Sequence, residues 1–159
     1  MTRYAVLAAK LQNELIKVRT AVRSALSQAE KAKNTGDNDF WIAAAFSLQN
    51  FYMGTERIFE EVAKQIDNAL PSGESSHRAL LEQMALEIAN TRPPLILGDT
   101  LDRLQEYRGF RHVAIHRYGI ELRPDRTREL VEMLIDTAAI LTRDVEAFCE
   151  FLLDLEKSI

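Results

Sequence analysis

The sequence is poor in the residues that interrupt helices or cross-link a chain. Among its 159 residues there are 6 glycines, 4 prolines and one cysteine, Cys149. A single cysteine excludes an intrachain disulfide framework and a cysteine-based metal cluster. Because glycine and proline are scarce while alanine, leucine, glutamate and arginine are plentiful, the composition favours helices along the whole chain.

Long apolar segments are also missing. No apolar run approaches the roughly 20 residues that a membrane-spanning helix needs. The N-terminus lacks the basic and then apolar order of a secretory signal. Internal repeats and low-complexity tracts are absent as well. We therefore expect one domain over residues 1–159, located in the cytoplasm and without a membrane partner.

Apolar residues recur at intervals of three and four, which is the period of one helix face. With the polar, glycine-containing and proline-containing breaks between them, they predict an all-α, up-and-down bundle of about five helices. Asp99 is expected to cap the fourth helix, Gly119 to end it, and Pro124 to open the fifth. The predicted ranges are about 2–33, 38–69, 75–89, 99–118 and 124–155.

The arginines are concentrated in one part of the chain. Between residues 103 and 128, seven arginines accompany three acids, a local net charge of +4. Since the whole chain carries −4, the remainder carries −8. Such a basic focus, a local cluster of arginines in an otherwise acidic chain, can bind a nucleic-acid phosphate backbone at one place. Ordinary solvent-exposed arginines would give the same local excess of positive charge. These arginines are Arg103, Arg108, Arg111, Arg117, Arg123, Arg126 and Arg128.

The segment whose side chains are best suited to catalysis or binding is residues 107–119, which holds two of the three histidines. Arg111 stays protonated, so it can bind and neutralise a phosphate group. His116 is expected in the last turn of a helix, where carbonyl ends favour its protonated form and nearby arginines oppose it. Such a histidine can exchange protons near neutral pH. Tyr118 adds a hydroxyl. Supporting or nucleic-acid-binding roles are expected for Arg108, His112, Arg117 and Tyr118.

Helix geometry separates the two central residues of this stretch. On an ideal helix Arg111 and Tyr118 share one face, whereas His116 is displaced from Arg111 by roughly 140°. Either the helix unwinds near His116, or two copies of the chain complete one site about a twofold axis. An isologous dimer creates a cleft that a single helical ridge lacks, so we expect a homodimer with a composite site.

A metal site is the alternative to phosphate binding in this stretch. His112 and His116 are four residues apart, a spacing that can place two imidazoles on one ion. The neighbouring arginines would repel a cation, so we expect neither a metal nor a cofactor. Arg108 remains an alternative to Arg111 as the central phosphate-binding residue.

Three polar residues earlier in the chain were also considered. Glu56 interrupts an apolar stripe, so it either meets a cation, such as an arginine of residues 107–119, or faces solvent. His77 is expected in the first turn of the third helix, as a surface or capping residue. Tyr52 is expected to serve packing.

The order Arg111, four residues, His116, one residue, Tyr118 resembles the Arg-x4-His-x-Tyr motif of HepT-type HEPN ribonucleases, the toxin half of a bacterial toxin–antitoxin pair. His112, directly after the arginine, matches the polar residue of the wider HEPN signature. Outside the motif, the resemblance extends to two segments that look like the second and third helices of such chains. These segments are residues 50–59 and 76–81.

This resemblance implies a homodimeric toxin that cleaves RNA without a metal, with Arg111 and His116 in a cleft between the copies. Attack by the 2′-hydroxyl of RNA would leave a 2′,3′-cyclic phosphate and a 5′-hydroxyl. It also implies a nucleotidyltransferase antitoxin of the MNT type, which transfers AMP from ATP to Tyr118. The alternative is a non-catalytic HEPN-like bundle that only binds a nucleotidyltransferase. A purely structural bundle would leave the arginine focus unexplained.

Overall fold

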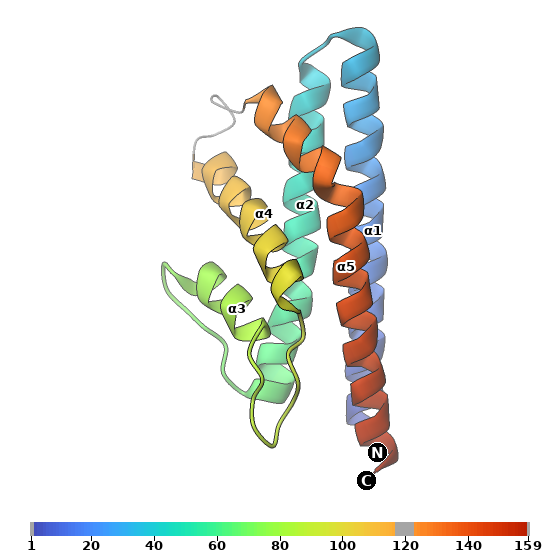
Figure 1. The fold of residues 1–159 in the computed structure, drawn as a ribbon, viewed down its shortest axis with the longest axis vertical. Helices are drawn as coiled ribbons and strands as arrows, with labels where there is room; N and C mark the ends of the chain where they lie inside the picture. Colours follow the sequence, from blue (N-terminus) through green and yellow to red (C-terminus); the bar gives the residue numbers. More distant parts are fainter. Residues whose placement is uncertain (1, 117–122, 159) are drawn as a thin grey trace.

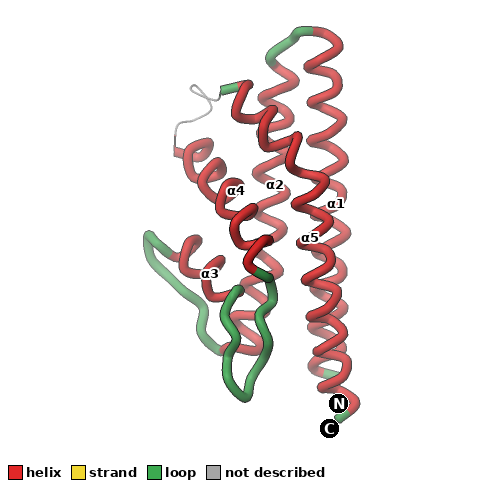
Figure 2. Tube along the Cα trace, in the orientation of Figure 1, coloured by secondary structure: helices red, strands yellow, loops and turns green. Residues whose placement is uncertain are grey.

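The computed structural model describes residues 2–116 and 123–158, and it describes side chains in 2–111 and 123–158. Within these residues the chain forms five α-helices joined by loops, as Figure 2 shows, with one isolated β-bridge between Ile88 and Arg92. None of the described helices is long and apolar enough to cross a membrane. The elements are α1 (Arg3–Thr35), α2 (Asp39–Val62), a π-helical turn (Ala63–Asp67), α3 (Ser76–Met84), α4 (Gly98–His116) and α5 (Pro124–Lys157).

The helices run alternately up and down the long axis of the molecule (Figure 1). α1 rises, α2 returns beside it, α4 rises again and α5 descends along α1, so that the two ends of the chain lie close together. α3 and α4 lie on the side of α2 that faces away from α1. The predicted all-α, up-and-down bundle is confirmed, with α3 as a short addition.

The interface between α1 and α2 rests on small and aliphatic residues. α1 buries the predicted stripe from Leu7 to Ala29. On α2, Gly54 lies against Val18, and a Cβ atom added at Gly54 would come within 2.9 Å of the Cγ2 atom of Val18. Glycine is therefore required for the close approach of these two helices.

α2 is buried around more of its circumference than the sequence predicted. Phe40 and Ile66 fit the interval of three and four residues but are only partly buried, whereas Trp41, Leu48 and Tyr52 are buried. The reason is that α2 contacts α1, α3, α4 and α5 and so occupies the centre of the bundle.

The predicted end of the third helix, near residue 89, was wrong, whereas the second helical segment ends close to its predicted end near residue 69. α2 ends at Val62 and passes into the π-helical turn, while α3 ends at Met84. The Nε atom of Arg92 donates to the Oδ1 atom of Asp67 at 2.6 Å. The Arg92 guanidinium also donates to three carbonyl oxygens at or after the end of α3. It thus provides hydrogen-bond donors where a further helical turn would have provided backbone N–H groups. These carbonyls belong to Gln83, Leu86 and Pro93.

α4 begins one residue earlier than predicted, so Asp99 lies inside its first turn instead of preceding it. The start of α4 is held by α5: the Oδ2 atom of Asp144 accepts hydrogen bonds from the Leu97 amide at 3.0 Å and from the Thr100 hydroxyl. Pro124 opens α5 as predicted. Gly119, the predicted end of α4, lies outside the described residues.

Candidate functional site

The rotation of α4 about its axis is fixed by a buried tyrosine. The Tyr107 hydroxyl donates to the Leu130 carbonyl of α5 at 2.6 Å. The Tyr107 ring lies edge-on to the Phe51 ring of α2, with the ring centres 5.2 Å apart. Burial raises the pKa of Tyr107 to about 12, so the hydroxyl remains a donor. Tyr107 lies between α2 and α5. The neighbouring Arg108 and Arg111 are therefore close enough to α2 for their charges to affect the pKa of Tyr52.

These two arginines are partly buried. The Nε atom of Arg108 donates to the Oε1 atom of Gln105 at 2.9 Å. The Nε atom of Arg111 is buried and has no hydrogen-bond partner among the described residues. A buried guanidinium N–H without an acceptor is unfavourable, so this position favours an added anion.

Tyr52 of α2 lies fully buried near these arginines, and its hydroxyl has no partner among the described residues. Burial raises the pKa of Tyr52, and the negative charge of Glu56 raises it further. The positive charges of Arg108 and Arg111 act in the opposite direction. The Glu56 carboxylate and the guanidinium groups of Arg108 and Arg111 are therefore all close enough to the Tyr52 hydroxyl to affect its pKa.

Glu56, one helical turn after Tyr52, is 4% exposed. Its Oε2 atom lies 2.8 Å from the Nδ1 atom of His77, at the start of α3. The carboxylate thus meets a histidine, and not the arginine that the sequence suggested as one possibility. We call Tyr52, Glu56, His77, Arg108 and Arg111 the α2–α4 polar cluster.

Sequence reasoning assigned no site role to Tyr52 and little to His77. The signal for Tyr52 was its position one turn before Glu56, which puts both on one helix face. No local signal identified His77, because it reaches Glu56 only through the packing of α3 on α2, across 21 residues of chain.

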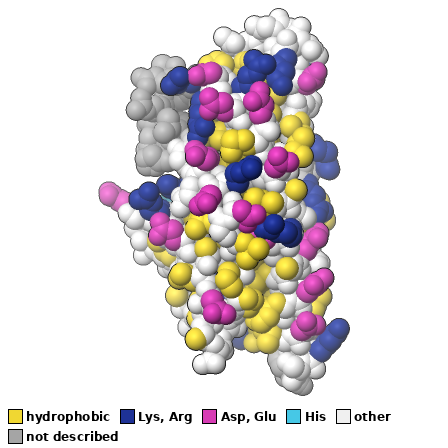
Figure 3. Space-filling model, in the orientation of Figure 1, with side chains coloured by type: hydrophobic (Ala, Val, Ile, Leu, Met, Phe, Trp, Pro, Cys, Tyr) yellow, Lys and Arg dark blue, Asp and Glu magenta, His cyan; other side chains and the backbone are white. Residues whose placement is uncertain are grey.

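Other arginines of the predicted basic focus are paired with acids. Arg126 contacts Glu106 and Glu129, and Arg123 contacts Asp125. Figure 3 shows basic and acidic side chains interspersed over the visible face, without a broad field of one sign. In the described part of the chain, the cationic groups of the cluster are thus set in a mixed surface.

The remaining predicted site residues are only partly covered by the structure. His112 and His116 belong to the helical backbone of α4, while their side chains lie outside the description. Arg117 and Tyr118 lie outside the described residues altogether. Among the side chains that are described, no three His, Cys, Asp or Glu residues are placed to hold a metal ion.

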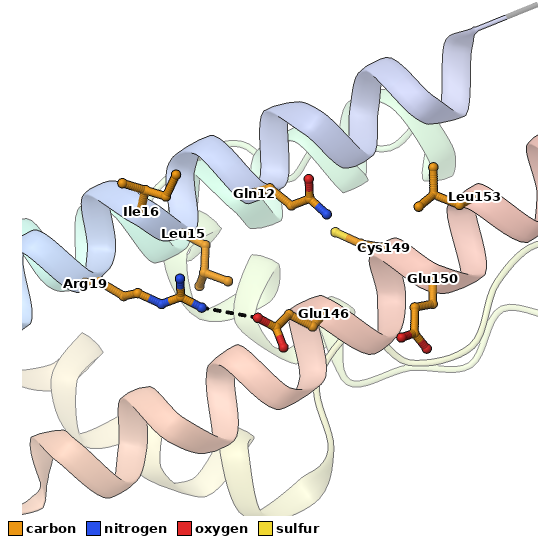
Figure 4. Close-up of a pocket in the computed structure, with 8 residues that line it drawn as sticks. All are labelled: Gln12, Leu15, Ile16, Arg19, Glu146, Cys149, Glu150 and Leu153. Atoms are coloured by element: carbon orange, nitrogen blue, oxygen red, sulfur yellow. Dashed lines mark hydrogen bonds and ion pairs between the residues drawn. The ribbon is translucent and has the colours of Figure 1, made fainter.

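A separate groove of about 360 Å³ lies between α1 and α5 (Figure 4). The ion pair between Arg19 and Glu146 crosses it, at 3.2 Å. Cys149 lines the groove, and burial raises the pKa of its thiol to about 11. Because a protonated thiol is a poor nucleophile, this groove offers no cysteine chemistry.

The fold and the cluster define a class of protein: an all-helical bundle with partly buried arginines on its fourth helix. A family model described as HepT-like protein matches residues 43–152, which span α2 to α5. The chain belongs to this HepT-like family of HEPN-domain proteins. Neither a curated protein nor a solved structure matches the chain.

Proposed function

We propose that this protein is a toxin-type endoribonuclease that cleaves RNA without a metal ion. The observation that carries the proposal is the buried Nε atom of Arg111, which has no partner among the described residues, beside Arg108 in a chain of the HepT-like family. Arg111 binds the phosphate at which cleavage occurs, and Arg108 assists it. His112 and Arg117 contact the neighbouring RNA backbone.

The reaction uses the nucleophile of the substrate itself. A base removes the proton of the RNA 2′-hydroxyl, and O2′ forms a bond to phosphorus. The bond from phosphorus to O5′ breaks, its electron pair stays on O5′, and an acid delivers a proton there. Arg111 stabilises the charge that develops on the phosphorane. His116 supplies one of the two proton transfers.

The active form is a homodimer with a site shared between copies. α4 is helical up to His116, its last described residue, and an unwinding directly after it lies outside the described residues. Positions 111 and 116 are then roughly 140° apart around the helix axis. A twofold partner supplies the second position. The Nε–H of Arg111, which no described residue accepts, supports this arrangement, because it leaves a donor for substrate or partner.

The toxin context of the family supports a second protein as the natural inhibitor. An MNT-type nucleotidyltransferase transfers AMP from ATP to Tyr118: the tyrosine oxygen bonds to the α-phosphorus, and pyrophosphate leaves. The new phosphate and nucleoside place negative charge and bulk near Arg111 and so block RNA. RNA, a second copy of this chain and this antitoxin are the proposed partners. The site of action is the cytoplasm.

The proposal is tested with purified, unmodified protein and RNA in the presence of EDTA. The parent protein is expected to form 2′,3′-cyclic phosphate and 5′-hydroxyl ends. His116→Ala should lower the cleavage rate by about 10²- to 10⁴-fold, because a general acid–base residue contributes this much. Circular dichroism and sedimentation should report an unchanged fold and dimer.

The matched control lies in the substrate. A single 2′-deoxy nucleotide removes the nucleophile, so cleavage should stop at that position and continue elsewhere. If the verified dimer cleaves none of several RNA classes, the endoribonuclease proposal fails. The non-catalytic HEPN-like partner of a nucleotidyltransferase then becomes the better interpretation.

A further inference from the structure

The pair of Glu56 and His77 has no role in the chemistry described so far. Glu56 is 4% exposed, and transferring a lone carboxylate into such a place is strongly unfavourable. Among the described residues, its hydrogen-bonding partner is a histidine whose side chain is 50% exposed. A buried carboxylate that holds an exposed imidazole is an arrangement enzymes use to orient a base.

The contact determines which nitrogen of His77 is available. The carboxylate accepts, so Nδ1 carries the hydrogen and donates it to the Oε2 atom of Glu56 at 2.8 Å. In the neutral ring Nε2 then has the free electron pair. No described residue forms a hydrogen bond with Nε2, so this nitrogen is open to a ligand.

The pair also lies on the same side of the bundle as the proposed phosphate site. Glu56 and the two arginines, Arg108 and Arg111, act on the same Tyr52 hydroxyl. α3, which carries His77, packs against both α2 and α4. Figure 1 shows α3 and α4 on the same side of α2. An exposed imidazole, two guanidinium groups and a buried carboxylate are thus gathered on one side of the bundle.

RNA cleavage through the 2′-hydroxyl requires two proton transfers, and His116 supplies one. We propose that His77 supplies the other, as the general base that removes the 2′-hydroxyl proton through Nε2, and that Glu56 is its positioning residue. His116 is then the acid that protonates O5′. The proton taken by His77 returns to solvent after the product leaves, so the cycle consumes only RNA. This inference rests on the proposed ribonuclease function.

The first test separates catalysis from RNA binding. In the full-length dimer, His77→Gln is expected to lower kcat at least 100-fold, with less than a threefold change in affinity for RNA that carries 2′-O-methyl groups. Arg78→Gln is the matched control, because Arg78 is adjacent and exposed and, among the described residues, its ion pair is with Glu82 one turn away. This control should cleave at the parent rate.

The second test distinguishes base from acid. An RNA whose scissile O5′ is replaced by sulfur has a leaving group that needs no proton. Its cleavage should be restored in His116→Ala, which lacks the acid, and should stay slow in His77→Gln, which lacks the base.

Glu56→Gln keeps an acceptor for Nδ1 but removes the charge. It is expected to lower kcat by about 10- to 100-fold, the range for partners that orient a reacting group, again with unchanged RNA affinity.

Loss of His77 alone leaves Glu56 buried without its partner, which could unfold the protein. The double variant Glu56→Gln and His77→Gln removes that charge and keeps two groups able to hydrogen-bond. It should fold and should be as slow as His77→Gln.

Parent-rate cleavage by either folded variant overturns the inference. Restored cleavage of the sulfur substrate by His77→Gln, or a loss of RNA binding that parallels the loss of cleavage, also overturns it. If the parent protein itself fails to cleave RNA, the proposed function fails; if it cleaves and only these results go wrong, only the role of His77 fails.

Discussion

Tyr52 and Tyr107 are buried tyrosines on α2 and α4 whose hydroxyls differ in one respect. The Tyr107 hydroxyl donates to the Leu130 carbonyl at 2.6 Å, and the Tyr52 hydroxyl has no partner in the described part of the chain. Burying an unpaired hydroxyl costs about 1–3 kcal/mol. Tyr52→Phe is therefore expected to raise the free energy of unfolding by about 1 kcal/mol, measured by urea denaturation.

Tyr107→Phe is the matched control and should shift stability in the opposite direction. It removes a formed hydrogen bond, so the free energy of unfolding should fall by about 1 kcal/mol. Both measurements belong near pH 7, where burial keeps the hydroxyls protonated because it raises both pKa values. If Tyr52→Phe destabilises the protein as Tyr107→Phe does, the Tyr52 hydroxyl has a partner, and its proximity to Arg111 needs no functional reason.

At the scale of the helix, α4 depends on a single carboxylate of α5. Asp144 is 5% exposed and accepts from the Leu97 amide, the Thr100 hydroxyl and the Arg143 guanidinium. Asp144→Asn removes the charge that these donors share. We expect the free energy of unfolding to fall by about 2 kcal/mol, in line with hydrogen bonds to charged groups.

Asp136→Asn is the control for this change, because Asp136 is an exposed residue on the same helix. It should alter stability by less than about 0.5 kcal/mol. Urea denaturation measures both variants. Equal effects of the two substitutions would mean that Asp144 does not anchor α4, and that packing around Tyr107 alone positions Arg111.

How well the sequence predicts each helix depends on how many neighbours that helix has. α1 and α5 bury mainly one stripe each, so the interval of three and four residues predicted them well. α2 touches four helices, so its burial follows no single stripe. The ends of α2 and α3 depend on Arg92 and Asp67, which are 25 residues apart and paired by tertiary packing.

The same reasoning applies to the candidate site. Arg108 and Arg111 could be selected from the sequence, because arginine chemistry and motif spacing are local properties. The partner of Glu56 could not be selected, since His77 and the arginines of α4 meet near it only when α3 and α4 pack against α2. The sequence therefore identified the arginines of the cluster, for which we propose phosphate binding, and missed the pair of Glu56 and His77, for which we propose proton transfer.

At the scale of the whole molecule, the proposed homodimer explains how one surface could bring together positions on different sides of α4. The helix is regular through His116, so positions 111 and 116 are roughly 140° apart in each copy. In a twofold arrangement, Arg111 of one copy and His116 of the other can share a cleft, and the dimer has two such clefts.

This arrangement predicts complementation between two inactive variants. Arg111→Ala and His116→Ala are each expected to cleave at least about 100-fold more slowly than the parent as homodimers. When equal amounts are unfolded together and refolded, half of the dimers contain one copy of each. Each mixed dimer has one cleft with both native residues and one with neither, so specific activity should recover to about a quarter of the parent value. If each site lies within one copy, every site lacks a residue, no activity returns, and the shared site is wrong although the ribonuclease proposal stands.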